Sequence, residues 1–94
     1  MLALFDKVVF APCNANVVGI LDVATNSFET VSTGTLTMDW KFSGAATVGS
    51  TVVFAPHAAN EVGIFDVTTS RFTTVSAGSI IGPAKFSGAA ALSF

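Results

Sequence analysis

VVFAP at residues 8–12 returns as VVFAP at residues 52–56, and KFSGAA at residues 41–46 returns as KFSGAA at residues 85–90. When the comparison is extended from these stretches, residues 8–50 align with residues 52–94 without insertion or deletion, and more than half of the aligned pairs are identical. The offset is 44 residues throughout. A period of this length indicates that the repeated unit is a supersecondary structure rather than a short motif.

The residue types in both copies predict an all-β fold. Val, Ile, Thr and Phe are abundant, whereas Glu, Lys and Gln, which usually fill the surfaces of helices, are nearly absent. In the complete copy we expect four strands, over residues 42–48, 51–55, 62–67 and 71–76. Gly49 lies between the first two, where glycine tolerates the positive φ of a tight hairpin turn.

Two repeated motifs resemble those of β-propeller blades. The first is D-x-x-T-x-x-F, which begins at Asp22 and again at Asp66, and the second is F-S-G-A-A at residues 42–46 and 86–90. We expect the aspartates to accept backbone N–H groups of the turn that follows each of them. Together the motifs resemble blades of the kelch and YVTN-like kind, with Ser-Gly-Ala in place of the kelch Gly-Gly doublet, and the resemblance covers nearly the whole chain.

The resemblance implies a propeller in which residues 42–48 form the innermost strand of a blade. Gly44, Ala45 and Ala46 are small enough for neighbouring backbones to approach one another near the axis. The repeated phenylalanines would then pack between successive blades.

Composition indicates that this chain hides apolar surface against other molecules. Hydrophobic residues make up 51% of its 94 residues and charged residues 11%, with a mean hydropathy of +0.70. A small domain buries a limited share of its surface, so we expect apolar patches to remain. No apolar run approaches the roughly 18–20 residues of a spanning helix, and residues 1–6 lack the pattern of a signal peptide. Without a membrane partner, oligomerisation is the expected way to bury this surface.

Charge and cysteine content exclude further classes of partner. The net charge is −2 and the pI is near 4.9, with charges scattered singly, whereas nucleic-acid binding requires clustered Lys and Arg. Cys13 is the only cysteine, and the second copy has His57 in its place. No intrachain disulfide is therefore possible, and a single free Cys is compatible with the cytoplasm without establishing the compartment.

Two blades leave two apolar faces uncovered, so we expect several chains to complete one propeller. Residues 1–40 would form a first blade with an incomplete inner strand, residues 41–84 a second blade, and residues 85–94 an inner strand donated to the neighbouring chain. In this alignment Met1 to Leu4 match the end of the inner strand. The expected assemblies are a six-bladed homo-trimer or an eight-bladed homo-tetramer, ahead of a four-bladed dimer, and a ring with an odd number of blades is a further alternative.

The function predicted from these features is that of a non-enzymatic self-assembling propeller scaffold that binds a partner through its loops. One alternative is a purely structural fragment without a dedicated ligand, natural or reconstructed as a model of propeller evolution. A second is lectin-like glycan binding, since small fucose-binding lectins also trimerise two-blade chains into six-bladed rings. Their Arg, Glu and Trp sugar site is not present here, so the parallel concerns assembly only.

Candidate ligand-binding residues lie in the longer loops, which are expected at one rim of the propeller. Trp40 could stack on a sugar or base, and repeated lysines before the inner strands could form an anion site or pair with aspartates. The repeated asparagines are most simply explained by a left-handed backbone conformation. A glycan, a peptide or a small anion is the expected ligand. The candidate residues are Asn16, Asp39, Trp40, Lys41, His57, Asn60 and Lys85.

Metal binding and catalysis find little support in the sequence. Cys13 and His57 occupy equivalent positions, but zinc requires three or four ligands and the chain has no other Cys or His. One His, no Tyr and carboxylates placed mainly in turns leave no combination of nucleophile, base and orienting residue. The sequence therefore predicts no enzyme, no metal and no cofactor.

Overall fold

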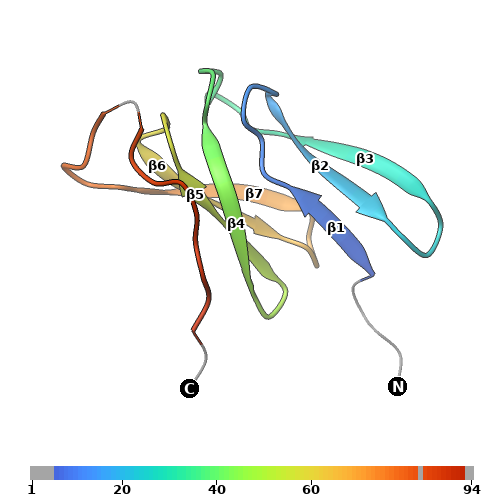
Figure 1. The fold of residues 1–94 in the computed structure, drawn as a ribbon. Coiled ribbons are helices and arrows are strands. Elements are labelled where there is room, and N and C mark those ends of the chain that lie inside the picture. Colours follow the sequence, from blue (N-terminus) through green and yellow to red (C-terminus); the bar gives the residue numbers. More distant parts are fainter. Residues whose placement is uncertain (1–5, 83, 93–94) are drawn as a thin grey trace.

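The computed structural model describes residues 6–82 and 84–92, and its fold class is all-β (Figure 1). Two antiparallel sheets lie side by side, one with strand order β1-β2-β3 and one with strand order β4-β5-β6-β7. The first sheet consists of β1 (Lys7–Phe10), β2 (Val17–Asp22) and β3 (Ser27–Ser32). The second consists of β4 (Phe42–Val48), β5 (Thr51–Pro56), β6 (Glu61–Asp66) and β7 (Arg71–Ser76).

The four strands predicted for the complete copy are confirmed to within one residue at each end. Gly49 has φ of 57° in the turn between β4 and β5, as expected for a tight hairpin. The register of this hairpin pairs Val48 with Thr51 and Ala46 with Val53. Neighbouring strands follow one another in the chain throughout both sheets, which is the meander that the repeated turn chemistry predicts.

The repeated aspartates organise the turns that follow β2 and β6, as predicted. The Oδ1 atom of Asp22 accepts the backbone N–H of Ala24 at 3.0 Å, and that of Asp66 accepts the N–H of Thr68 at 2.8 Å. Asp66 also accepts the hydroxyl of Thr68, which has no equivalent at Ala24. These residues are part of the scaffold because they close the two turns.

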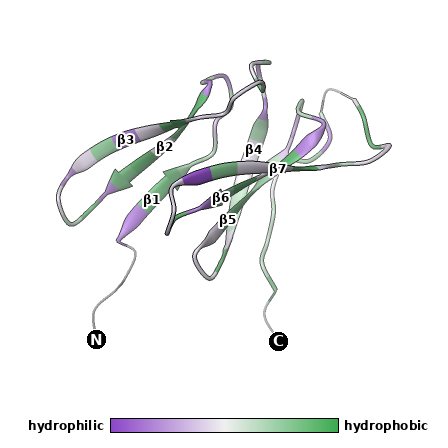
Figure 2. Ribbon diagram, turned by 180° about the vertical axis from the view of Figure 1, so that it is seen from behind, coloured by the Kyte–Doolittle hydropathy of each residue, from purple (hydrophilic) through white to green (hydrophobic). Residues whose placement is uncertain are grey.

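One hydrophobic core lies between the two sheets. The first sheet contributes Val18 and Ile20 from β2, and the second contributes Phe54 and Phe65 from β5 and β6. Phe42, from the start of β4, completes the cluster, and its ring centroid lies 5.5 Å from that of Phe54. Figure 2 shows hydrophobic residues along β1 and β2. Only part of this apolar surface is buried in the core.

Residues 84–92 follow the second sheet as an irregular segment alongside β4 (Figure 1). The backbone N–H of Phe86 donates to the carbonyl of Pro56 at 3.1 Å, just as the N–H of Phe42 donates to that of Pro12 at 3.2 Å. The hydroxyl of Ser43 donates to the carbonyl of Phe86 at 2.6 Å. The segment is therefore attached to the second sheet in the way that β4 is attached to the first.

Parts of the expected organisation lie outside the described residues. The alignment of Met1 to Leu4 with an inner strand falls there, and so do residues 93–94 of the segment expected to be donated. Among the described residues the first sheet has three strands and β1 is its edge. No helix in the described ranges is long and apolar enough to cross a membrane.

Candidate functional site

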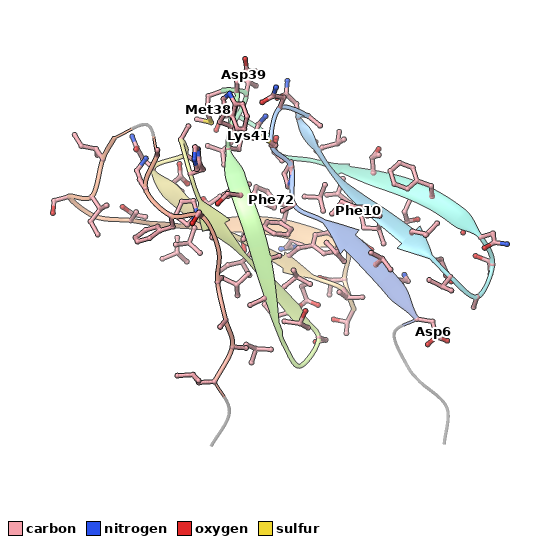
Figure 3. All side chains as sticks on the ribbon, viewed as in Figure 1. Asp6, Phe10, Met38, Asp39, Lys41 and Phe72 are labelled. Atoms are coloured by element: carbon pink, nitrogen blue, oxygen red, sulfur yellow. The ribbon has the colours of Figure 1, made fainter. Side chains whose placement is uncertain are left out.

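Loops from both sheets meet at one end of the molecule and enclose a shallow hollow of about 520 Å³. Figure 3 shows Met38, Asp39 and Lys41 gathered at this end, opposite Asp6 at the start of β1. Three of the predicted ligand-binding residues line the hollow, together with two alanines. The lining residues are Asp39, Trp40, His57, Ala58 and Ala84.

Trp40 is held in an unusual backbone conformation beside the hollow. Its φ is 59°, which bulky residues rarely adopt, and its backbone N–H donates to Oδ1 of Asn14 at 2.9 Å. Its carbonyl accepts the N–H of Ala58 at 2.7 Å. The Trp40 side chain is 60% exposed, and its ring lies 6.0 Å from that of His57 at a tilt of 43°. The two rings thus form an aromatic surface held in place by backbone bonds.

His57 occupies the boundary between this hollow and a second one of about 300 Å³. Its backbone N–H donates to the carbonyl of Lys41 at 2.8 Å, and its own carbonyl accepts the N–H of Lys85 at 3.0 Å. The Nδ1 atom of His57 is buried without a hydrogen-bond partner among the described residues. A buried polar atom of this kind carries a desolvation cost that only a partner can offset.

The two repeated lysines bind backbone carbonyls, so neither of the roles expected for them from the sequence fits their surroundings. Lys41 is fully buried, and its Nζ donates to the carbonyls of Asn14 at 3.2 Å and Ala15 at 2.7 Å. Lys85 is half-buried, and its Nζ donates to three carbonyls, with a distance of 3.2 Å to that of Ala58. No ion pair with an aspartate occurs in the described part of the chain.

Asn16 and Asn60 are exposed, but neither has the left-handed backbone that the sequence suggested. Positive φ occurs instead at Asn26 and Ser70, which are equivalent positions in the turns after β2 and β6. The carbonyl of Asn16 accepts the N–H of Thr33 at 3.0 Å, and the carbonyl of Asn60 makes the matching bond with Ala77. The repeated asparagines close loops through their backbones and do not line the hollow.

Asn14 is a residue of this site that sequence reasoning missed. Its side chain caps the N–H of Trp40, and its carbonyl accepts a bond from Lys41. A signal was available, because the second copy replaces Asn14 by Ala58 and replaces Trp40 by Ala84. The two residues that touch in the first copy are therefore lost together in the second.

A second candidate site is apolar and consists of two sheet faces. The front face of a sheet is defined by Val8, Phe10, Val23 and Phe28 in the first copy, which align with Val52, Phe54, Val67 and Phe72 in the second. The back face is defined by Val18, Ile20 and Leu36 in the first copy, which align with Val62, Ile64 and Ile80 in the second. The core joins the back face of the first sheet to the front face of the second.

The front face of the first sheet is exposed at all four of its positions, whereas on the back face of the second sheet Ile80 is exposed and Val62 and Ile64 are half-buried. Phe54 is 0% exposed on the covered front face, whereas its equivalent Phe10 is 49% exposed on the uncovered one. Leu36 is 6% exposed on the covered back face, whereas its equivalent Ile80 is 52% exposed. Each uncovered face therefore carries the same kind of residues that form the core elsewhere in the molecule.

Few groups in the described residues are arranged for chemistry. No three His, Cys, Asp or Glu side chains lie close enough to hold a metal ion together in residues 6–82 and 84–92. The hydroxyl and backbone N–H of Thr68 hold the pKa of Asp66 below its ordinary value of 3.8, with smaller contributions from Thr69 and Arg71. This perturbation belongs to a turn and not to the hollow.

Comparisons of the chain with protein-family models, with curated proteins and with solved structures find no match in any of the three.

Proposed function

We propose that the chain is a non-enzymatic scaffold that assembles head to tail with copies of itself into a closed β-propeller. The observation that carries this proposal is the contrast between equivalent positions on covered and uncovered faces, such as Phe54 and Phe10. Exposed apolar patches of this kind are typical of protein interfaces. In the assembly, residues 1–40 belong to a first blade and residues 41–84 to a second, and residues 85–94 complete the neighbouring chain's first sheet.

The interface between the two sheets of one chain is the template for the interface between chains. Within the chain, the back face of the first sheet packs on the front face of the second. Between chains, the back face of the second sheet would pack on the front face of the next copy's first sheet. Because the donor and acceptor surfaces differ, this contact is heterologous and continues until a ring closes. Three chains would give six blades and four chains eight.

The edge strand supports the same arrangement. Among the described residues β1 pairs only with β2, so its other side presents unpaired backbone groups. Residues 86–90 repeat the residues that begin β4, yet they form no strand in the isolated chain. Pairing these residues with β1 of another copy would satisfy both sets of backbone groups and remove an aggregation-prone edge.

Native mass spectrometry of the full chain tests the proposal. We expect a single closed species of three or four chains at micromolar concentration, and a variant lacking residues 85–94 should lose it. The deletion removes the donated segment but leaves β1 to β7 intact, so its circular dichroism should retain β structure if the two sheets fold. A full-length chain that stays monomeric, or a truncated chain that still forms the ring, would contradict the proposal.

The hollow supports a second candidate function, the binding of a glycan by the assembled ring. Trp40 and His57 present an aromatic surface on which a sugar ring can stack, and the carboxylate of Asp39 lies at its border. Since Trp40 is the only Trp in the chain, its fluorescence reports on this hollow specifically. A glycan array should identify a sugar that shifts this emission, with Asp39→Asn weakening the binding. An assembled ring that binds no glycan is a scaffold without this ligand.

A further inference from the structure

The front face of the first sheet contains a hollow of about 350 Å³ whose shape and lining point to one occupant. We propose that Phe86 of a second copy inserts into this hollow and thereby fixes the register of the donated segment. This inference rests on the proposed assembly and adds to it the side chain that anchors each contact. Phe10, Gly19 and Phe28 are among its lining residues.

The second sheet shows what fills the equivalent place. There Phe42 is 1% exposed and lies over Gly63, so that a Cβ built on Gly63 would approach Cζ of Phe42 to 2.8 Å. Its ring centroid lies 5.5 Å from that of Phe54 and 6.3 Å from that of Phe72, the latter edge-on. Glycine is needed at this position because the ring of Phe42 occupies the space of a side chain.

The first sheet has the equivalent residues, but there the exposed ring of Phe28, rather than a third phenylalanine, lies over the glycine. Phe10, Gly19 and Phe28 align with Phe54, Gly63 and Phe72, and the rings of Phe10 and Phe28 lie 6.4 Å apart. The three atoms nearest a Cβ built on Gly19 belong to these two rings, the closest being Cζ of Phe28 at 3.0 Å. Phe28 is also 61% exposed. The glycine and its two phenylalanines therefore form a receptor for an aromatic side chain that the described residues of this copy do not supply.

Phe86 is the phenylalanine that matches this receptor. It aligns with Phe42 within the repeated KFSGAA stretch and is 45% exposed, although its backbone is bonded to Pro56 and Ser43. The backbone bonds hold the residue in place before any partner arrives, which lowers the entropic cost of association. Its N–H bond to Pro56 places it next to the second sheet, so it extends from the face that the next copy would cover.

The register follows from the hairpin of the second sheet. There Gly44 pairs with Ala55, Ala45 with Phe54 and Ala46 with Val53, with an irregularity before Gly44. The equivalent pairs between copies are Gly88 with Ala11, Ala89 with Phe10, and Ala90 with Val9. A shift by one residue would move every side chain of the segment to the opposite face and withdraw Phe86 from the hollow.

Two variants with complementary defects test the inference. Phe86→Ala keeps the receptor but removes the anchor, whereas Gly19→Leu keeps the anchor but fills the receptor. Each variant alone should be monomeric, because loss of a buried phenylalanine contact weakens each interface by about a hundredfold or more. Mixed in equal amounts they should form heterodimers, since Phe86 of the Gly19→Leu chain can still enter the open receptor of its partner. Leu92→Ala, which truncates another exposed apolar residue of the same segment, should assemble like the unaltered chain.

The outcomes separate this inference from the proposed assembly. If the unaltered chain forms a ring and Phe86→Ala forms it equally well, the anchor is wrong while the assembly stands. If both variants give the circular dichroism of the folded chain and their mixture stays monomeric, the anchor is also wrong. A Gly19→Leu chain that does not fold is replaced by Gly19→Ala, which narrows the same receptor. A monomeric unaltered chain overturns both proposals.

Discussion

At the scale of single residues, Lys41 illustrates how a buried polar group can join two sheets. Its side chain is fully buried, and its Nζ bonds the carbonyls of Asn14 and Ala15 in the loop between β1 and β2. Its backbone bonds Cys13 and His57, so one residue connects loops of both sheets. Such a group stabilises the fold only as long as each of its bonds is made.

Lys41→Met should therefore destabilise the chain, because it removes the bonds from the buried Nζ to the carbonyls of Asn14 and Ala15. We expect a loss of about 1–3 kcal/mol in the free energy of unfolding, measured by urea denaturation. Lys85→Met is the matched control, since Nζ of Lys85 also bonds backbone carbonyls, including that of Ala58 at the position equivalent to Asn14, but the residue is only half-buried. Both should be measured in the Phe86→Ala chain so that assembly does not contribute. Equal losses from the two substitutions would show that burial of Lys41 is unimportant.

Asp66 provides a prediction about pH. Its pKa is lowered in the folded chain, first by the hydroxyl of Thr68, so its ionised form stabilises the fold above pH 3.8. This contribution is lost as the pH falls through the lowered pKa. Thr68→Val should raise the pKa of Asp66, and the stability lost through the substitution should be largest near neutral pH and shrink in acid. Ala24→Val changes the equivalent position of the first turn without removing a hydroxyl and serves as the control.

The pKa of Asp66 can be followed by NMR titration of its carboxyl carbon, and stability by urea denaturation at several pH values. A Thr68→Val chain with an unchanged Asp66 pKa would show that the hydroxyl bond does not form in solution. If the stability difference between the Thr68→Val chain and the unaltered chain grew as the pH fell, the prediction that it shrinks in acid would be wrong.

At the scale of elements, strands and turns could be predicted from sequence because their causes are local. The strand over Arg71–Ser76 follows from β-branched and aromatic residues that favour extended backbone, and the turn at Gly49 follows because glycine tolerates its positive φ. The hollow could not be predicted, since it depends on Trp40 in a left-handed conformation and on backbone carbonyls that every residue type carries. The surroundings of Lys41 were missed for the same reason.

The two strand glycines should respond differently to the same substitution. Gly63→Ala places a Cβ 2.8 Å from the rings of Phe42 and Phe54, both enclosed in the core, and should destabilise the chain by about 1–3 kcal/mol. Gly19→Ala meets exposed rings that can turn away, so monomer stability should change little. Urea denaturation in the Phe86→Ala chain measures both. Comparable losses at the two glycines would contradict the view that only one receptor is filled.

At the scale of the whole molecule, the arrangement of one sheet relative to the other would decide how many copies close the ring in the proposed assembly. The chain contains one complete contact between a back face and a front face. Repetition of the same contact between copies rotates each blade by the same angle, so the ring size is a property of this single interface. The 44-residue period of the sequence predicts that the contact is repeated. The angle between one sheet and the next depends on how Phe42, Phe54 and Val18 pack together.

Disulfide cross-linking should read the ring size directly. In a Cys13→Ser background, Val9→Cys and Ala90→Cys place one thiol on β1 and one on the donated segment, at positions equivalent to the Val53 and Ala46 pair. Cross-strand partners lie close enough for a disulfide to form, so oxidation should link neighbouring copies. Denaturing electrophoresis without reductant should then show a ladder that ends at three or four chains.

Ala89→Cys combined with Val9→Cys is the control, because adjacent residues of a strand point to opposite faces and should not cross-link. A ladder that continues beyond four chains would indicate open filaments, in which the repeated contact fails to close. Equal cross-linking by the control pair would show that the segment has no fixed register, and cross-links confined to single chains would mean that no strand is exchanged. A ladder that ends at a defined number of chains is expected only if every copy both donates a segment and accepts one, because a closed ring has no free strand edge to which a further copy could add.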